Sequence, residues 1–313
     1  MKQTYGWILV TILAAGAAAS AQAPTRFRSS VDLVALNVVA SDGQGRLISG
    51  LNRENFSVSE DGVPQQISFF AAAPMPIDLA ILLDTSSSMS DKIATVQAAA
   101  VGFIAAIRAG DRVTVVDIKD TVRVIHPLNE DASGARAAIQ ATVPKGNTSL
   151  YNGLYMTLRE LVKQRASGGD GRRQAIVVLS DGDDTTSLVS YDDVSELAKR
   201  SGVAIYTITL RSPFARNTFA RNTAVNSESE FSMKELSMVT GARAFFPAAI
   251  TELAGVYGVI ADELATQYSL GYSPVNPRRD STFRRVDVRI DRPGIRARTR
   301  TGYLGGETAV ATR

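Results

Sequence analysis

The sequence predicts an α/β protein in which a doubly wound sheet with one antiparallel strand is joined to a small β-rich module. Residues 77–266 alternate strand-like and helical segments, which is typical of this class. Two strand-like stretches flank a tight connection at Lys119-Asp120, so at least one pairing in the sheet is expected to be antiparallel. The β-type pattern of residues 28–73 returns in residues 267–304, and we expect these two flanks to pack together as one split module.

Residues 1–21 have the pattern of a cleaved secretory signal. Lys2 precedes an apolar stretch that ends in small residues, and we place the cleavage after Ala21. The alternative is a retained N-terminal anchor, but the apolar run is shorter than the roughly 20 residues that a membrane span needs. We therefore expect a secreted or periplasmic protein with no stable membrane span after cleavage.

Composition excludes several classes of site. The chain of 313 residues is 45% hydrophobic, enough for a sizeable core, and it has no cysteine, so disulfides, thiol catalysis and zinc–thiolate sites are excluded. The net charge of +3 gives no reason to expect a nucleic-acid partner. Nine arginines occur between Arg278 and Arg300, but they are interleaved with aspartates and with Val and Ile, a pattern that predicts a solvated strand face.

The first half of the chain has clear strand and turn signals. Asp61-Gly62 predicts a hairpin within the first β-rich flank. The continuous apolar run IDLAILL, residues 77–83, is typical of a strand buried on both faces of a parallel sheet. The segment after it has apolar residues at helical spacing, and we expect that helix to stop at Gly110.

The alternation of strands and helices continues toward the second β-rich flank. Ser190 is positioned to open a helix, and Ser232 with Glu235 has the pattern of a capping box for a helix that Gly241 would close. Between them FARNT occurs twice in tandem, at 214–223, either as a duplicated flexible loop or as a recognition loop. The expected helices lie near 132–141, 149–165, 191–200 and 250–267, and the expected strands at 174–180, 203–210 and 243–246.

Polar side chains follow the first buried strand. The strand ends at Asp84, and Ser86 and Ser88 come at alternate positions of the turn that follows. On a tight turn, residues spaced by two can direct their oxygens toward one point, and such hard oxygens suit Mg²⁺, Ca²⁺ or Mn²⁺. These residue types also cap helices, so one strand end alone leaves both interpretations open.

Two further loops offer the same kind of ligand. PKGNTSL, residues 144–150, presents Thr148 at the start of a helix, and the strand QAIVVLS runs directly into Asp181 and Asp183. Ligands in an open α/β sheet bind at the carboxyl ends of the strands, so we expect these three loops to meet at one rim.

Together these segments resemble the metal-ion-dependent adhesion site of von Willebrand factor type A domains. DTSSS at 84–88 matches the motif DxSxS, GNT at 146–148 matches the threonine loop, and LSDGDD at 179–184 matches the third motif. The resemblance covers about residues 77–266 and implies a Rossmann-like sheet. The flanks are similar to those of a group of secreted bacterial proteins that contain this domain.

The resemblance implies that Asp84, Ser86, Ser88, Thr148 and Asp181 hold a divalent cation, Mg²⁺ with Mn²⁺ or Ca²⁺ as alternatives. Ser86 and Ser88 would be direct hydroxyl ligands, Thr148 a direct or conformation-dependent one, and the two aspartates would act directly or through water. Neutral hydroxyls leave the cation electron-poor, and two carboxylates roughly neutralise it without filling its octahedron. An Asp or Glu of a protein partner could enter the open position, so the expected function is metal-mediated adhesion.

The other residues of the three loops have structural interpretations. We expect Ser87 to be a turn residue and Met89 to pack in the core. Asn152 stands where many relatives carry an aspartate, at a position that is not a core metal ligand. Asp183 and Asp184 match acidic positions of the third motif, and we interpret both as solvated loop carboxylates.

Enzymatic alternatives lack their required residues. A phosphatase of the haloacid-dehalogenase type needs a second acid where Ser86 stands, and a serine hydrolase needs a base, for which the chain has one histidine, His126, that we interpret as structural. There is no G-x-S-x-G elbow and no phosphate-binding glycine loop after the first strand. We therefore expect no enzyme; a remaining alternative is an envelope scaffold whose metal only ties the loops together.

Overall fold

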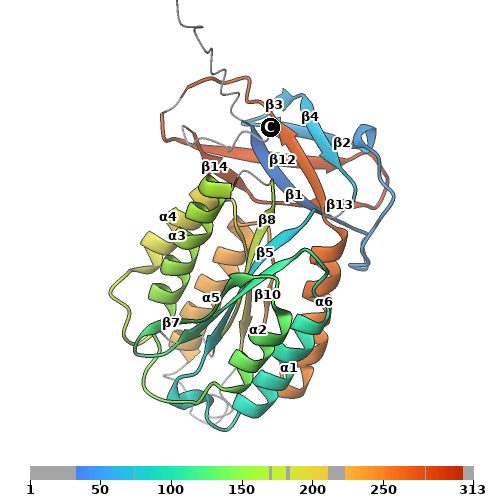
Figure 1. The fold of residues 1–313 in the computed structure, drawn as a ribbon. Coiled ribbons are helices and arrows are strands. Elements are labelled where there is room, and N and C mark those ends of the chain that lie inside the picture. Colours follow the sequence, from blue (N-terminus) through green and yellow to red (C-terminus); the bar gives the residue numbers. More distant parts are fainter. Residues whose placement is uncertain are drawn as a thin grey trace, which may run out of the picture. The chain divides into compact units, whose positions relative to one another are not determined.

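The computed structural model describes residues 33–73, 75–168, 171–180, 184–210, 223–278 and 280–305 (Figure 1). The predicted signal sequence, the FARNT repeat up to Asn222, and the residues Asp181 and Asp183 lie outside the described residues. Within the described part of the chain, no helix combines the length and the apolar character that a membrane crossing requires.

Six strands form the central sheet, in the order β10-β9-β8-β5-β6-β7. Neighbouring strands are parallel except β6 and β7, which pair antiparallel across the connection predicted at Lys119-Asp120. The predicted doubly wound sheet with one antiparallel strand is therefore confirmed. Its strands are β5 (Ile77–Asp84), β6 (Arg112–Ile118), β7 (Val122–Asn129), β8 (Arg173–Ser180), β9 (Ala204–Thr209) and β10 (Ala244–Phe245).

Helices cover both faces of this sheet (Figure 1). Apolar residues of α1, α2 and α6 form one core cluster with the sheet, and those of α3, α4 and α5 form a second cluster on the other face. The helices are α1 (Ile93–Ala105), α2 (Ala132–Gln140), α3 (Leu150–Gly168), α4 (Tyr191–Ser201), α5 (Thr223–Val239) and α6 (Leu253–Thr266), with short 3-10 turns η1 (Arg53–Asn55), η2 (Ser87–Met89) and η4 (Ile250–Glu252).

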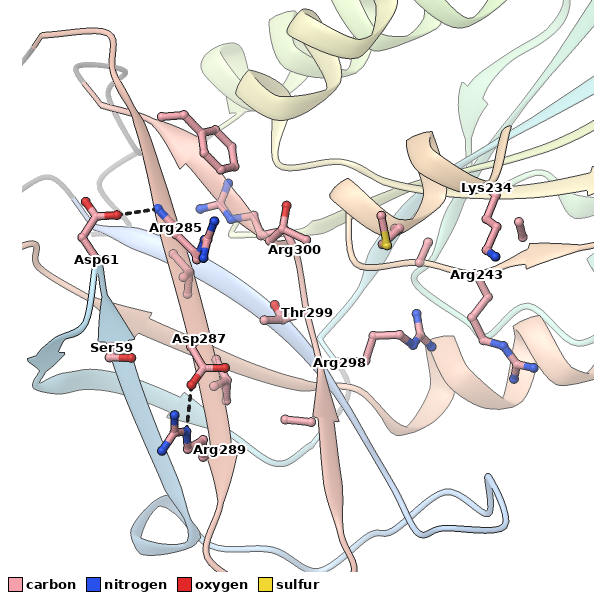
Figure 2. Close-up of a pocket in the computed structure, with 18 of the residues that line it drawn as sticks. Ser59, Asp61, Lys234, Arg243, Arg285, Asp287, Arg289, Arg298, Thr299 and Arg300 are labelled. Atoms are coloured by element: carbon pink, nitrogen blue, oxygen red, sulfur yellow. Dashed lines mark hydrogen bonds and ion pairs between the residues drawn. The ribbon is translucent and has the colours of Figure 1, made fainter. Parts of the chain in front are cut away.

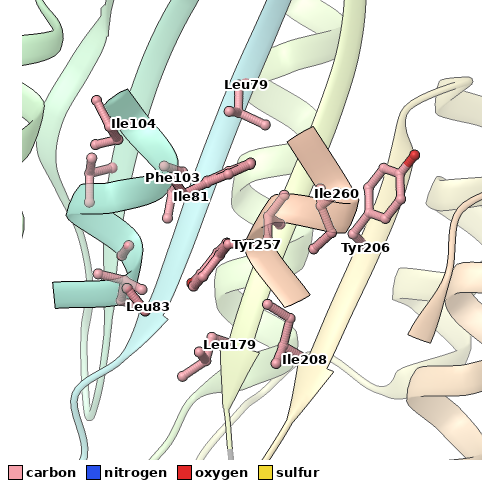
Figure 3. Packing of buried hydrophobic residues seen from close by; sticks show 14 of the residues in the cluster. Leu79, Ile81, Leu83, Phe103, Ile104, Leu179, Tyr206, Ile208, Tyr257 and Ile260 are labelled. Atoms are coloured by element: carbon pink, nitrogen blue, oxygen red, sulfur yellow. The ribbon is translucent and has the colours of Figure 1, made fainter. Parts of the chain in front are cut away.

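Strand β5 is central to both clusters. Leu79, Ile81 and Leu83 face the side of α1 and α6, where Phe103 and Tyr257 stack with ring centroids 4.9 Å apart (Figure 3). The alternate residues of β5 face the side of α3. Each fully buried Leu or Ile contributes roughly 1.5–3 kcal/mol, so the continuous apolar run fixes this strand in the middle of the sheet.

Two predicted helix boundaries are wrong. α1 ends at Ala105, and Gly110 instead takes a positive φ of 86° in the turn that leads into β6. Ser232 and Glu235 lie inside α5 and open no helix; there, the Ser232 carbonyl and the Glu235 carboxylate both accept hydrogen bonds from the Tyr191 hydroxyl. Met233 and Leu236 of α5 are buried in the core, so this turn lies within the helix and does not begin it.

The two flanks pair with each other, as predicted, in two four-stranded antiparallel sheets, β13-β1-β11-β4 and β14-β12-β2-β3. The hairpin at Asp61-Gly62 joins β2 to β3, with positive φ at both residues. The N-terminal strands are β1 (Val34–Ser41), β2 (Phe56–Glu60), β3 (Val63–Gln65) and β4 (Ile67–Ala71); the C-terminal ones are β11 (Tyr268–Tyr272), β12 (Phe283–Ile290), β13 (Arg296–Arg298) and β14 (Gly302–Leu304).

The arginine-rich strand β12 is solvated on one face, as predicted, but not on the other. Arg285 and Arg289 are exposed, whereas Arg284 is 3% exposed and pairs with the buried Glu60 at 3.2 Å. Glu60 also accepts hydrogen bonds from the hydroxyls of Tyr272 and Tyr303. Burying a charge requires such partners, so Arg284 has a structural role in joining strands of both flanks.

Candidate metal centre

The carboxylate of Asp84 lies at the carboxyl end of β5 and is completely buried. One of its oxygens, Oδ1, accepts a hydrogen bond of 2.9 Å from the backbone N–H of Ser86. The other, Oδ2, accepts a hydrogen bond of 2.6 Å from the hydroxyl of Ser180, the last residue of β8. The parallel pairing of β5 with β8 brings these two strand ends together.

The hydroxyls of Ser86 and Ser88 face each other, with 2.9 Å between their Oγ atoms. Ser86 is 2% exposed and stands at the N-cap position of η2, but its side chain makes no capping hydrogen bond. The capping interpretation therefore does not account for this hydroxyl. Spacing by two along the turn directs both oxygens to one point, as the sequence predicts.

Thr148 reaches the same carboxylate from the second loop. Its Oγ1 lies 3.5 Å from Asp84 Oδ2, and the residue is 3% exposed. Backbone hydrogen bonds tie the first two loops together, from Ser87 N–H to the Gly146 carbonyl and from Lys145 N–H to the Thr85 carbonyl, at 2.9 and 2.8 Å. The position of Thr148 is thus set by the same backbone that carries the serines.

Gly146 allows this loop to turn. Its φ is +78°, and a Cβ atom there would lie 1.9 Å from Asp120 Oδ2. Asp120 Oδ1 in turn accepts a hydrogen bond from the Asn147 N–H at 2.9 Å. A glycine is required here because the left-handed conformation and the close carboxylate both exclude a side chain.

The third loop begins outside the described residues, at Asp181. Farther along this loop, the N–H groups of Thr185 and Thr186 donate to the carbonyl of Thr148 at 2.9 and 3.1 Å. Asn152 Oδ1 accepts from the N–H groups of Leu188 and Val189, both at 3.2 Å. Asn152 therefore positions the third loop, a role that sequence reasoning missed.

The interpretation of Asp184 as a solvated carboxylate is wrong. Asp184 is half-buried, and it accepts hydrogen bonds from the Ser187 hydroxyl at 2.6 Å and from the Tyr151 N–H at 3.2 Å. It therefore links the third loop to the first turn of α3. Asp183 lies outside the described residues.

Sequence reasoning also missed a supporting group behind the rim. Thr85 Oγ1 donates to Asp117 Oδ1, and Asp117 Oδ2 pairs with Lys119 Nζ at 2.9 Å. Lys119 Nζ also donates to the carbonyl of Val143, just before the threonine loop. The only signal in the sequence for this group is that Asp117 interrupts the apolar strand β6.

The remaining predicted structural residues have the expected surroundings. Met89 is fully buried in the core, and Ser87 is an exposed turn residue. His126 is 6% exposed, with its Nε2 3.0 Å from Asn129 Oδ1.

The described donors fit a small, hard divalent cation. Asp84 and Thr148 supply one pair of oxygen atoms within hydrogen-bonding distance, and Ser86 and Ser88 supply a second pair. The described residues contain no cluster of three or more His, Cys, Asp or Glu side chains, so the candidate donors here are the Asp84 carboxylate and hydroxyl groups. Oxygen-only ligation of this kind is what Mg²⁺, Ca²⁺ and Mn²⁺ prefer.

A family model, the von Willebrand factor type A domain, matches residues 78–250, more than half of the chain. The uncharacterized protein sll0103 of Synechocystis sp. is 29% identical over 112 residues, which are 35% of this chain and 26% of that protein. The alignment thus spans about a quarter of that relative. The family match includes all three loops described above.

Several solved structures are similar to this chain. A von Willebrand factor type A protein from Catenulispora acidiphila is 12% identical, with 92% of this chain and 78% of that chain covered and a TM-score of 0.49. Proximal thread matrix protein 1 of the mussel byssus, with a zinc occupied MIDAS motif, is 16% identical, with 66% and 49% covered and a TM-score of 0.49. The vWF domain of the pilus tip protein Mfa5 from Porphyromonas gingivalis is 14% identical, with 61% and 95% covered and a TM-score of 0.48.

Proposed function

The chain belongs to the von Willebrand factor type A domain family, and on that premise we propose that it captures an acidic group of a protein partner through a bound divalent cation. Domains of this family often mediate metal-dependent protein binding. The observation that carries the proposal is the convergence of the Asp84 carboxylate with the backbone N–H of Ser86 and the hydroxyl of Thr148, from two separate loops, at one buried point.

We assign the cation to Asp84, Ser86, Ser88, Thr148 and Asp181, with Mg²⁺ as the preferred ion and Mn²⁺ or Ca²⁺ as alternatives. The cation supplies a positive centre for a partner's Asp or Glu carboxylate. The protein's own residues prepare that centre: Ser180 and the Ser86 N–H orient the carboxylate of Asp84, and backbone hydrogen bonds hold the Thr148 loop. Preorganised ligands lower the cost of binding because little conformational freedom remains to be lost.

The proposal includes secretion through residues 1–21 and a binding role without catalysis. Domains of this family are generally binding domains, and the single histidine is held by Asn129 on β7. The competing function is an envelope scaffold in which the metal only joins the three loops. The two functions differ in whether the cation keeps a position that a partner can enter.

Manganese provides a direct test of that difference. Bound Mn²⁺ loses the electron paramagnetic resonance signal of the free ion, so a titration of the secreted chain measures the number of sites, which we expect to be one. The relaxation rate of water protons then reports whether the bound ion has an exchangeable water. We expect such a water, and we expect a glutamate-containing peptide to displace it.

Matched variants separate the site from nonspecific binding. Thr148→Ala and Asp181→Asn are expected to weaken Mn²⁺ binding by about tenfold or more, since each removes a ligand. Asp192→Asn removes an exposed carboxylate of α4 and should leave Mn²⁺ affinity unchanged. A bound ion without exchangeable water would favour the scaffold, and equal Mn²⁺ affinity in all variants would refute the metal site.

A further inference from the structure

A broad groove lies apart from the metal rim, beside the exposed face of β12. Its volume is about 1500 Å³, which exceeds the roughly 300–1,000 Å³ of ordinary small-molecule pockets. Figure 2 shows Arg285 and Arg289 along β12, with Lys234 of α5 and Arg243 across the groove from them. The described metal-ligand candidates do not line it, so it is a separate site.

The groove is strongly cationic. Six of the described residues that line it are basic, against the two carboxylates of Asp61 and Asp287; the basic residues are Lys234, Arg243, Arg285, Arg289, Arg298 and Arg300. Positive charge on both walls of a concave surface raises the local concentration of anionic ligands. The weak net charge of the whole chain conceals this local excess.

Existing ion pairs neutralise part of this charge only. Arg243 and Arg298 share one buried carboxylate, that of Glu263, at 3.1 and 2.5 Å. Arg289 pairs with Asp287 at 2.8 Å, and both side chains are largely exposed, so this pair is readily exchanged for a ligand.

Among the residues that the structure describes, the other cations of the groove have no acidic partner. Within the described chain, the side chains of Lys234 and Arg285 make no ion pair and are exposed. The guanidinium of Arg300 lies over the Tyr303 ring at 5.3 Å, and burial lowers the pKa of Arg300. An anion in the groove would offset the cost of these charges.

Apolar side chains stand beside the cations. Met238 is 55% exposed and Phe283 is 43% exposed, and both line the groove together with Phe246. A flexible methionine and aromatic rings that line the same groove suit the varied side chains of a peptide. A polysaccharide or nucleic-acid backbone offers no aliphatic side chains to match this surface.

We propose that this groove binds an extended acidic segment of another polypeptide, in which Asp or Glu residues alternate with apolar residues. Carboxylates match the forked geometry of arginine, and the apolar residues would cover Met238 and Phe283. The chain's own segments outside the described residues do not fit, because residues 1–32 and 306–313 contain one acid each and residues 211–222 contain none. This binding is independent of the cation proposed above.

The test uses a fluorescein-labelled peptide of repeated Glu-Glu-Leu units, with a Gln-Gln-Leu peptide as its uncharged match. Fluorescence anisotropy is measured with the full secreted chain in EDTA, at low and at high ionic strength. We expect the acidic peptide to bind and the uncharged peptide not to bind. EDTA should leave this binding unchanged, and high ionic strength should weaken it. Loss of binding in EDTA would show that the peptide binds at the metal rim, which would overturn the proposal.

Substitutions locate the binding. The double variant Lys234→Gln with Arg285→Gln is expected to weaken peptide binding about threefold to tenfold, because it removes two cations that hold no ion pair in the fold. Lys163→Gln with Arg292→Gln removes two exposed cations outside the groove and should have no effect. Equal affinities for both double variants would overturn the proposal.

A third comparison identifies the class of ligand. Met238→Gln should weaken the binding of the acidic peptide but not the binding of heparin or single-stranded DNA, since only the peptide offers apolar side chains. Tighter binding of heparin or DNA than of the peptide, insensitive to Met238→Gln, would show a general polyanion site and refute the peptide proposal.

Discussion

Strand β5 carries a buried aspartate near each end, and the two have opposite surroundings. Asp78, near the start, is 2% exposed and forms ion pairs with Arg112 at 2.8 Å and Arg172 at 2.6 Å. Asp84, at the end, is surrounded by groups that include the Ser86 N–H and the hydroxyls of Thr148 and Ser180. One strand therefore holds one carboxylate in an ion-pair cluster with two arginines, and another whose described partners include neutral donors.

The difference shows how a buried charge can be used. A buried carboxylate is stable when it is paired or when it coordinates a metal. The guanidiniums around Asp78 occupy the carboxylate and leave no place for a ligand, so this end has a structural role. The hydroxyls of Thr148 and Ser180 orient the carboxylate of Asp84, which suits the proposed cation.

The largest expected effects come from two variants that remove the charge of Asp78 and the charge of Asp84 separately. Asp78→Asn should lower the free energy of unfolding by about 3–5 kcal/mol, because it leaves two guanidiniums without their partner. Asp84→Asn should cost only about 1 kcal/mol in EDTA, the value of a lost hydrogen bond, yet abolish stabilisation by Mg²⁺. Urea unfolding with and without Mg²⁺ measures the free energy of unfolding of both variants. If Asp78→Asn and Asp84→Asn lost the same free energy of unfolding in EDTA, the distinction between the two ends of β5 would be contradicted.

Alanine substitutions at two glycines extend the comparison, with a smaller expected effect on stability. Gly146, at the metal rim, and Gly241, where the chain after α5 meets the backbone of Thr299 and Arg300, both have φ of +78°. Alanine at either position should cost about 1–3 kcal/mol of stability. Gly146→Ala should also weaken Mn²⁺ binding, because the new Cβ displaces Asp120, whereas Gly241→Ala should not.

A control variant at Gly202 measures the cost of the left-handed backbone conformation by itself. Gly202 has φ of +64°, but a Cβ atom there would meet only arginine side chains, at 3.3 Å or more. Gly202→Ala therefore reports the left-handed conformation with little steric conflict. Unchanged Mn²⁺ affinity in Gly146→Ala would show that the threonine loop is not set by this turn.

The smallest expected effect is the acid dependence of stability. Burial by itself raises the pKa of Asp78, but hydrogen bonds from Arg112 and Arg172 outweigh it and hold the pKa below its ordinary value of 3.8. The folded state therefore favours the ionised form, so this stabilisation is complete above pH 3.8 and is lost as the pH falls through the lower, folded pKa.

The slope for one carboxylate is at most about 1.4 kcal/mol per pH unit. Asp78→Asn should remove that part of the acid dependence when unfolding is followed from neutral pH to pH 3. An identical acid profile in the variant and the parent protein would contradict the assignment.

Local sequence signals were reliable where the structure depends on neighbours in the chain. The run IDLAILL indicated a buried strand, and the spacing by two of Ser86 and Ser88 allowed their oxygens to converge. The same local logic failed at Ser232 and Glu235, which lie inside α5 beside the buried residues Met233 and Leu236.

Some roles depended on distant partners and could not be derived from local patterns. Ser180 contacts Asp84 across 96 residues of sequence, and Asp78 meets Arg172 across 94. No periodicity relates such positions, so local patterns did not indicate the arginines that pair with Asp78 or the hydroxyl of Ser180 that supports Asp84. Asn152 contacts the Leu188 N–H across 36 residues of sequence, and Asp184 contacts the Tyr151 N–H across 33.

By itself the sequence determined the α/β class, the antiparallel strand at Lys119-Asp120, the pairing of the flanks and the three motifs that carry the proposed ligands. These follow from burial patterns and turn chemistry, which act over a few residues. The tertiary structure decided which carboxylate is closed by arginines, which hydroxyls surround Asp84, and that basic residues from α5, β12 and the stretch after β13 line one groove. Such arrangements depend on how strands pack side by side, because charge and hydrogen bonding act across space between residues that the sequence keeps far apart.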